Sequence, residues 1–118
     1  MDTLEFSTNW NHKLDCDCFT TIRLQNAKKY TKGNEFQILL HSGKKQVIKG
    51  IAEVVEIKNV FLNGLDDYTC LLDTGYTADA TVKLIKEMYK HKSINWNRQM
   101  LSVIMLRKIK FETQTLFS

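Results

Sequence analysis

The 118-residue sequence predicts one α+β domain over residues 1–118, in which about six strands form a mostly antiparallel sheet. We expect this sheet to curl into a barrel. One main helix and a short helical turn complete the predicted fold. Most apolar residues alternate with polar ones at the period of a strand, and a single segment has the period of an amphipathic helix. Strands and helices do not alternate along the chain, which argues against a parallel sheet of βαβ units.

The first half of the chain carries the predominant strand pattern. We expect strands over Thr3–Ser7, Phe19–Leu24, Glu35–His41 and Gln46–Lys58. The last of these is apolar on both faces, as in a central strand, and Gly50 allows it to bend. The polar segment from Gln25 to Asn34 indicates a loop or a helical turn.

The second half contains the convincing helix. Thr77 is a good N-cap, and Ala78–Lys90 places apolar side chains at helical spacing. A closing strand is expected over Met100–Ile109, and a short strand over Tyr68–Leu72. The tail from residue 110 carries Phe111, Leu116 and Phe117 and is expected to be either frayed or docked.

Composition narrows the class of protein. No apolar run is long enough to span a membrane, and residues 1–5 lack the features of a signal peptide, so we expect a cytoplasmic protein. Cys16, Cys18 and Cys70 are expected to be reduced. His12 with Cys16 and Cys18 provides too few ligands for zinc, and we expect no metal and no cofactor.

The net charge of +4 is unevenly placed. Basic residues predominate over residues 10–49 and 77–118, whereas residues 51–76 are acidic. Such a surface attracts polyanions through counterion release. Lysine-rich surfaces also serve solubility alone, so the charge leaves both interpretations open.

The strand Cys18–Leu24 carries the strongest candidate site. Phe19, Thr21 and Arg23 alternate along it and therefore share one face. Arginine binds phosphate or a base edge, threonine donates a hydrogen bond, and phenylalanine offers a stacking surface. The alternative is structural, with Arg23 paired to a carboxylate and Thr21 present for its strand propensity.

Glu53 is a second candidate, because it lies on an apolar face of the long strand. A carboxylate in such surroundings either has a raised pKa, which suits an acid–base catalyst, or finds a basic partner. The segment Asp73-Thr74-Gly75 resembles half of an aspartic protease site, but that chemistry needs two carboxylates. We therefore assign Asp73–Tyr76 to a turn and helix cap.

Trp10 and Trp96 each lie between two asparagines. Tryptophan in such a loop either stacks on a base or fills the end of a barrel. Both roles remain open from the sequence.

Several elements together resemble the ASCH family, small β-barrel domains of the PUA-like superfamily. The resemblance runs from Phe19 to about Leu106 and includes Thr21-x-Arg23, Tyr30-x-x-Gly33 and the bent strand at Gly50. The family motif is G-x-K-x-x-T-x-R. Aligning its last two positions with Thr21 and Arg23 places Cys18 where the family has lysine.

The resemblance implies a PUA-like fold whose cleft binds RNA, a nucleoside or a nucleotide. In the amidohydrolases of that family, which act on acetylated cytidine, the motif lysine, the threonine and a downstream glutamate form the active centre. Carried over, Thr21 is the nucleophile and Glu53 the acid–base partner. Cys18 cannot supply the lysine's charge, and Lys13 is the nearby candidate to replace it.

The sequence thus leaves three hypotheses. The first is a binding module in which Arg23, Thr21, Phe19, Lys13 and Cys18 contact RNA or a nucleoside, while Lys28, Lys29 and Lys32 attract a nucleic-acid backbone. The second is a small amidohydrolase acting on acylated nucleosides through Thr21 and Glu53. The third is a non-enzymatic protein-interaction accessory.

Overall fold

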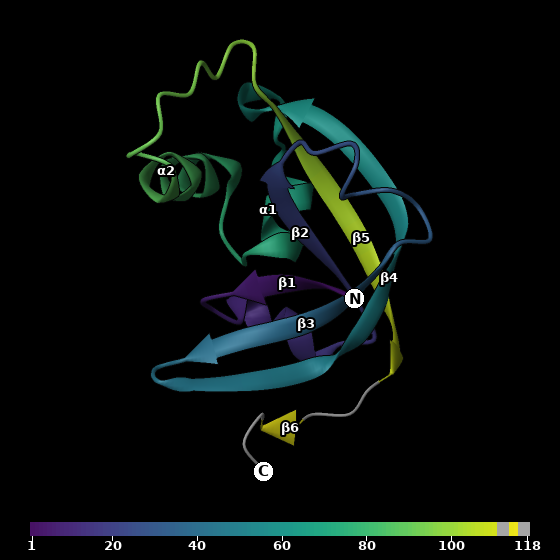
Figure 1. The fold of residues 1–118 in the computed structure, drawn as a ribbon. Coiled ribbons are helices and arrows are strands. Elements are labelled where there is room, and N and C mark those ends of the chain that lie inside the picture. The colour runs from purple at the N-terminus through teal and green to yellow at the C-terminus, as the bar shows by residue number, and fades with distance from the viewer. Residues whose placement is uncertain (111–113, 116–118) are drawn as a thin grey trace.

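The computed structural model describes residues 1–110 and the backbone of residues 114–115 (Figure 1). Its sheet has the strand order β1-β3-β4-β5-β2, and a short β6 pairs with β4. The strands are β1 (Asp2–Phe6), β2 (Cys18–Leu24), β3 (Glu35–Ser42), β4 (Lys45–Phe61), β5 (Met100–Lys110) and β6 (Gln114–Thr115). The helices are α1 (Asp67–Asp73) and α2 (Ala78–Met88), with 3-10 segments η1 (Trp10–Asp15) and η2 (Leu62–Gly64). The predicted α+β class is confirmed.

The sheet is mixed, which departs from the mostly antiparallel prediction at one edge. β1 runs parallel to β3, with Asp2 opposite Phe36 and Phe6 opposite Leu40. The other strand pairs are antiparallel. A parallel neighbour requires a long connection, and the chain supplies one through η1 and β2.

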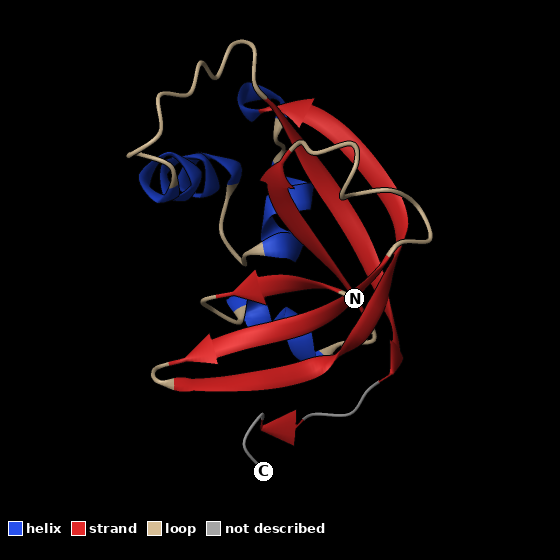
Figure 2. Cartoon of the chain, viewed as in Figure 1, coloured by secondary structure: helices blue, strands red, loops and turns tan. Residues whose placement is uncertain are grey.

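The predicted barrel is not closed by strand pairing in the described part of the chain. β1 and β2 form the two edges of the sheet, and strong curvature brings these edges toward each other (Figure 2). Side chains bridge them: Arg23 Nη2 donates to the Glu5 carbonyl at 2.8 Å, and the Phe6 and Phe19 rings lie 6.2 Å apart. This seam between β1 and β2 is where the candidate site forms.

The curvature depends on β4, which crosses both halves of the sheet. The first half of β4 pairs with β3 and the second with β5, with register shifts that include one between Ile51 and Ala52. Gly50 has φ of +122°, and a Cβ there would collide with the Lys110 carbonyl. A glycine is therefore required at this position, where the sequence predicted that the strand can bend.

Two apolar clusters hold the fold together. The first lies inside the curved sheet and includes Leu4, Phe36 and Ile104, all fully buried. The second lies beneath α2 and includes Ile85 and Leu101. Each fully buried side chain of this kind stabilises the fold by about 1.5–3 kcal/mol. The candidate site lies at the β1–β2 seam and is lined by residues from both clusters.

The expected strand over Tyr68–Leu72 is wrong, because this segment is the helix α1. The Asp66 carboxylate caps it by accepting from Thr69 N at 2.8 Å, and Asp67 ties it to α2 by accepting from Ala78 N at 2.7 Å. Short apolar runs do not by themselves distinguish a strand from a buried helix. The fold therefore has two α-helices rather than one main helix.

Other boundaries agree closely with the prediction. Thr77 caps α2 by accepting from Ala80 N at 3.3 Å, although α2 ends at Met88 rather than Lys90. The expectations for Phe111, Leu116 and Phe117 lie outside the described residues. Within those residues, no helix has the length and apolar character needed to cross a membrane.

Candidate functional site

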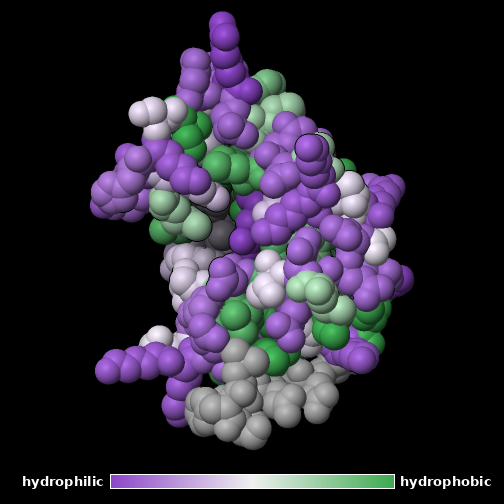
Figure 3. All heavy atoms as spheres, viewed as in Figure 1, coloured by the Kyte–Doolittle hydropathy of each residue, from purple (hydrophilic) through white to green (hydrophobic). Residues whose placement is uncertain are grey.

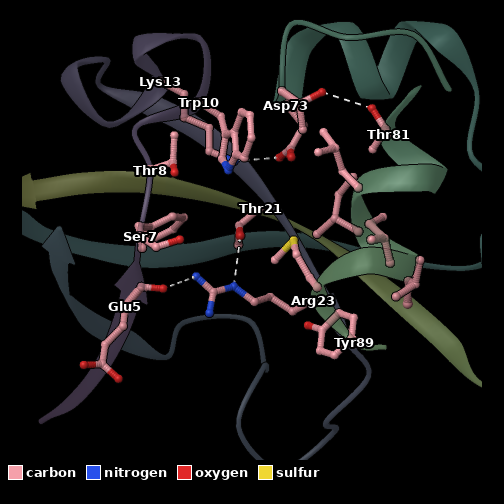
Figure 4. A pocket seen from close by; sticks show the side chains of 17 residues that line it. Glu5, Ser7, Thr8, Trp10, Lys13, Thr21, Arg23, Asp73, Thr81 and Tyr89 are labelled. Carbon is pink, nitrogen blue, oxygen red and sulfur yellow. Dashed lines mark hydrogen bonds and ion pairs between the residues drawn. The ribbon is translucent and has the colours of Figure 1, made fainter. Parts of the chain in front are cut away.

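A cavity of about 120 Å³ lies between the β1–β2 seam and the two α-helices. Figure 3 shows the surface hollowed beside the part of the molecule that carries α2. The polar side chains that line the cavity include Ser7, Thr8, Lys13, Thr21, Arg23 and Asp73 (Figure 4). The apolar ones include Phe6, Trp10, Ile85, Met88, Tyr89 and Leu101. One cavity thus combines charged, hydroxyl and aromatic groups.

Thr21 and Arg23 enter the cavity together from β2. Arg23 Nε donates to Thr21 Oγ1 at 3.0 Å, and the guanidinium lies 4.6 Å from the centroid of the Phe6 ring. The prediction that both side chains share a face is therefore confirmed. Together with the bond to Glu5, the described residues use two of the five N–H donors of Arg23. The other three donors have no recorded hydrogen-bond partner among the described residues.

Lys13 reaches the same cavity from η1. Two residues before it, Asn11 and His12, adopt left-handed backbone angles with φ of +55° and +53°. Such angles are costly for non-glycine residues, and here they turn Lys13 inward while His12 stays exposed. The Asn9 side chain supports the turn by accepting from Leu14 N at 2.9 Å.

Lys13 pairs with Asp73 from the end of α1. Lys13 Nζ lies 3.0 Å from Asp73 Oδ1, and Thr20 Oγ1 donates to the same oxygen at 2.8 Å. Lys13 is 5% exposed and Asp73 is 3% exposed. Burial lowers the pKa of Lys13, and the attraction of Asp73 offsets this only in part. The cavity therefore holds a desolvated ion pair.

Asp73 is the site residue that the sequence reasoning missed. The predicted turn and cap role is correct for Thr74, whose hydroxyl accepts from Tyr76 N at 3.1 Å and lies 3.0 Å from Thr81 Oγ1. Asp73 itself faces the cavity instead. Its partner Lys13 is 60 residues away in sequence. No local pattern reveals such a pair, and the sequence instead assigns Asp73 to a turn and helix cap.

Glu53 lies apart from Thr21, because it is on β4 and β5 separates that strand from β2. Arg107 Nη2 donates to Glu53 Oε1 at 2.5 Å across the β4–β5 pair. This is the basic partner that the sequence left open as an alternative. Glu53 does not line the cavity, so the structure does not bring the predicted catalytic pair together.

Two further predicted ligand residues also lie outside the cavity. Phe19 is 5% exposed and belongs to the core inside the sheet. Cys18 is exposed at the start of β2, opposite Arg107 on β5. Of the five predicted ligand contacts, the cavity therefore gathers Lys13, Thr21 and Arg23.

The predicted nucleic-acid lysines lie in the loop between β2 and β3. Lys28 and Lys29 line a separate, shallow depression with residues of β1. Lys32 pairs with Glu56 at 3.1 Å, with both side chains largely exposed. These lysines and the cavity form different surfaces.

The three cysteines are free thiols, with Cys16 and Cys18 exposed and Cys70 buried. Burial raises the pKa of the Cys70 thiol. Within residues 1–110, no three His, Cys, Asp or Glu side chains converge in a way that could hold a metal ion.

A solved protein structure has a fold similar to that of this chain. The chain is similar to protein EF3133 from Enterococcus faecalis V583, whose crystal structure is described as a DUF984 protein. The TM-score is 0.61 at 9% sequence identity, over 88% of this chain and 71% of that one. No family model and no curated protein match the sequence.

Proposed function

We propose that the protein binds a single nucleoside in the cavity at the β1–β2 seam. The observation that carries this proposal is the convergence of Thr21, Arg23 and Lys13 on one cavity that aromatic and aliphatic side chains also line. A nucleoside has a planar base for the apolar side chains and a hydroxylated sugar for the polar ones. The resemblance to the ASCH family adds support, because Thr21-x-Arg23 is the part of its motif that this chain keeps.

The size and lining of the cavity suit one ring system. The cavity measures about 120 Å³, and an engineered apolar cavity of about 150 Å³ takes up one benzene ring, so we expect the base to enter the cavity and the sugar to lie at its mouth. Phe6, Trp10 and Tyr89 provide aromatic surface around this space. Aromatic side chains stack on any base through its π-face.

The charges of the cavity favour a neutral ligand over a phosphorylated one. Asp73 neutralises Lys13, whereas Arg23 donates to the backbone carbonyl of Glu5, whose carboxylate instead lies 2.8 Å from His41 Nε2. Asp73 occupies Lys13 at 3.0 Å, and a phosphate placed there would meet a buried carboxylate. We therefore place nucleosides ahead of nucleotides and of an RNA backbone.

Calorimetric titration of the four ribonucleosides and their 5′-monophosphates tests the proposal. Arg23→Met keeps the stem that packs on Phe6 but removes the donors, and we expect affinity to fall about tenfold. Lys28→Ala, outside the cavity, is the matched control and should leave affinity unchanged. Equal, small losses in both variants would contradict a specific site.

Salt dependence separates this proposal from RNA binding through the lysine loop. Nucleoside affinity should change little with salt, whereas backbone binding must weaken steeply as salt rises. A single-stranded RNA that binds tightly, with a steep salt slope and sensitivity to Lys28→Ala, would favour the RNA hypothesis instead.

A second candidate function is hydrolysis of acylated nucleosides, and one observation favours it. Lys13 lines the same cavity as Thr21 and would take the role of the motif lysine, and the cavity carboxylate is Asp73 rather than Glu53. A lowered pKa suits Lys13 to accept a proton. The hydroxyl of Thr21 would attack the acyl carbon, the C–N bond would break, and the proton would pass through Lys13 to the leaving amine. Water would then hydrolyse the Thr21 ester.

The arrangement favours binding over this reaction. The hydrogen bond that the structure gives Thr21 Oγ1 comes from Arg23, which is always protonated and cannot act as a base. Incubation with acylated nucleosides decides the question. Turnover that Thr21→Val abolishes and Glu53→Gln leaves unchanged would establish the hydrolase with the cavity residues.

A further inference from the structure

Asp73 presents an acceptor that the fold itself does not use. The structure records two hydrogen bonds to its carboxylate, from Lys13 Nζ and Thr20 Oγ1, and both end at Oδ1. In the described part of the chain, every fully buried side-chain nitrogen or oxygen has a partner, so Oδ2 keeps contact with open space. Asp73 is only 3% exposed and lines the cavity, which means that this space is the cavity.

From this geometry we propose that Asp73 determines ligand specificity by accepting a hydrogen bond from an amino group on the base. The preferred ligands are then neutral nucleosides with an exocyclic amine. This inference rests on the proposed function, that the cavity binds a nucleoside. It adds which edge of the base is read and by which atom.

The chemistry of a carboxylate supports this selection. An ionised carboxylate only accepts hydrogen bonds, so Oδ2 accommodates an N–H group and repels a carbonyl oxygen at the same position. Glutamate and aspartate accept from the exocyclic amine of a base in the same manner elsewhere. A buried acceptor left without a donor is costly, so a base that lacks the amine should bind poorly.

Two of the neighbouring groups fix the orientation of the carboxylate. Lys13 donates to Oδ1, and this contact leaves Oδ2 to face the cavity. Thr20 reinforces the same orientation from β2. The acceptor is therefore positioned before the ligand arrives, which reduces the cost of binding.

Matched ligand pairs test the inference on the unmodified protein. Adenosine is compared with purine riboside, and cytidine with pyrimidin-2-one riboside, since each pair differs by one amino group replaced by hydrogen. We expect at least one amino nucleoside to bind about tenfold or more tightly than its partner, because a hydrogen bond to a charged group is lost. Equal affinity within both pairs would overturn the inference while leaving the proposed function intact. If no ribonucleoside binds, the proposed function fails, and the inference fails with it.

The variant Asp73→Asn tests whether this residue is responsible. The amide oxygen would stay against Lys13, and the amide nitrogen would face the cavity as a donor. The preference for the amino nucleoside should then disappear, while Lys28→Ala, which lies outside the cavity, should retain it. Circular dichroism and thermal melting establish that each variant is folded. A folded Asp73→Asn protein with an unchanged preference would overturn the assignment to Asp73.

Discussion

Two ion pairs in this protein differ in almost every physical respect. Lys13 and Asp73 join η1 to α1 beside the cavity, with side chains 6% and 4% exposed. Arg107 and Glu53 join β5 to β4 on the outside of the sheet, with side chains 58% and 25% exposed. Water screens the second pair and is largely absent from the first.

The comparison separates a candidate site from a surface contact. Glu53 is unusual in the sequence as a charge on an apolar strand face, but in the structure it pairs with an exposed arginine. Asp73 looked like a turn residue, yet it is a buried carboxylate beside a cavity. The candidate functional carboxylate is therefore identified by its burial beside a cavity and not by the local sequence pattern around it.

The largest expected effect comes from breaking the buried pair. Lys13→Met leaves the charge of Asp73 buried without its partner, and we expect the free energy of unfolding to fall by about 3–5 kcal/mol. Urea denaturation monitored by tryptophan fluorescence measures it. Arg107→Met is the control and should change stability far less. A similar loss in both variants would show that the two pairs do not differ in the way proposed.

Removing both partners should recover much of that loss. In Lys13→Met combined with Asp73→Leu no buried charge remains, and apolar replacement of a buried ion pair is often neutral or stabilising. The double variant should therefore be more stable than Lys13→Met alone, by the same denaturation assay. A double variant as unstable as the sum of the two single ones would mean that the pair is not coupled.

The dependence of stability on pH provides a smaller and independent test. Burial lowers the pKa of Lys13 below its ordinary value of 10.5 in the folded state. Between the two pKa values the unfolded chain binds more protons, so the contribution of Lys13 to the free energy of unfolding rises with pH. The stability difference between wild type and Lys13→Met should therefore grow as pH approaches 10.5. A flat difference would indicate that the pKa is not lowered.

The smallest expected effect is at Glu53. Glu53→Gln alters only the outer pair, so nucleoside affinity measured by calorimetry should stay within error of the wild type. Thr21→Val, which is nearly isosteric but removes the hydroxyl from the cavity, should weaken binding. If Glu53→Gln weakens nucleoside affinity as much as Thr21→Val does, Glu53 contributes to the binding site.

Elements that depend on neighbours in sequence were predictable. The cap at Thr77, the alternation that places Thr21 beside Arg23, and the bend at Gly50 all follow from local stereochemistry. Tyr68–Leu72 was assigned wrongly because five residues carry too little periodicity, and the deciding contacts come from the capping carboxylates of Asp66 and Asp67.

The candidate site was only half predictable for the same reason. Thr21 and Arg23 are two residues apart, and their shared face is a property of any strand. Lys13 was identified as a candidate from its proximity in sequence, but its entry into the cavity depends on left-handed angles at Asn11 and His12. Asp73 is brought to it by the packing of α1 against β2, over a separation of 60 residues.

The sequence by itself determined the α+β class, most strand positions, the capped helix α2 and the Thr21–Arg23 pair, because each depends on local periodicity or hydrogen bonding. Only the tertiary structure decided that the sheet is mixed and open at the β1–β2 seam. It also decided that Lys13 and Asp73 meet there and that Glu53 lies elsewhere. Burial and long-range pairing depend on how distant segments fold together, and neither is encoded in the spacing of residues along the chain.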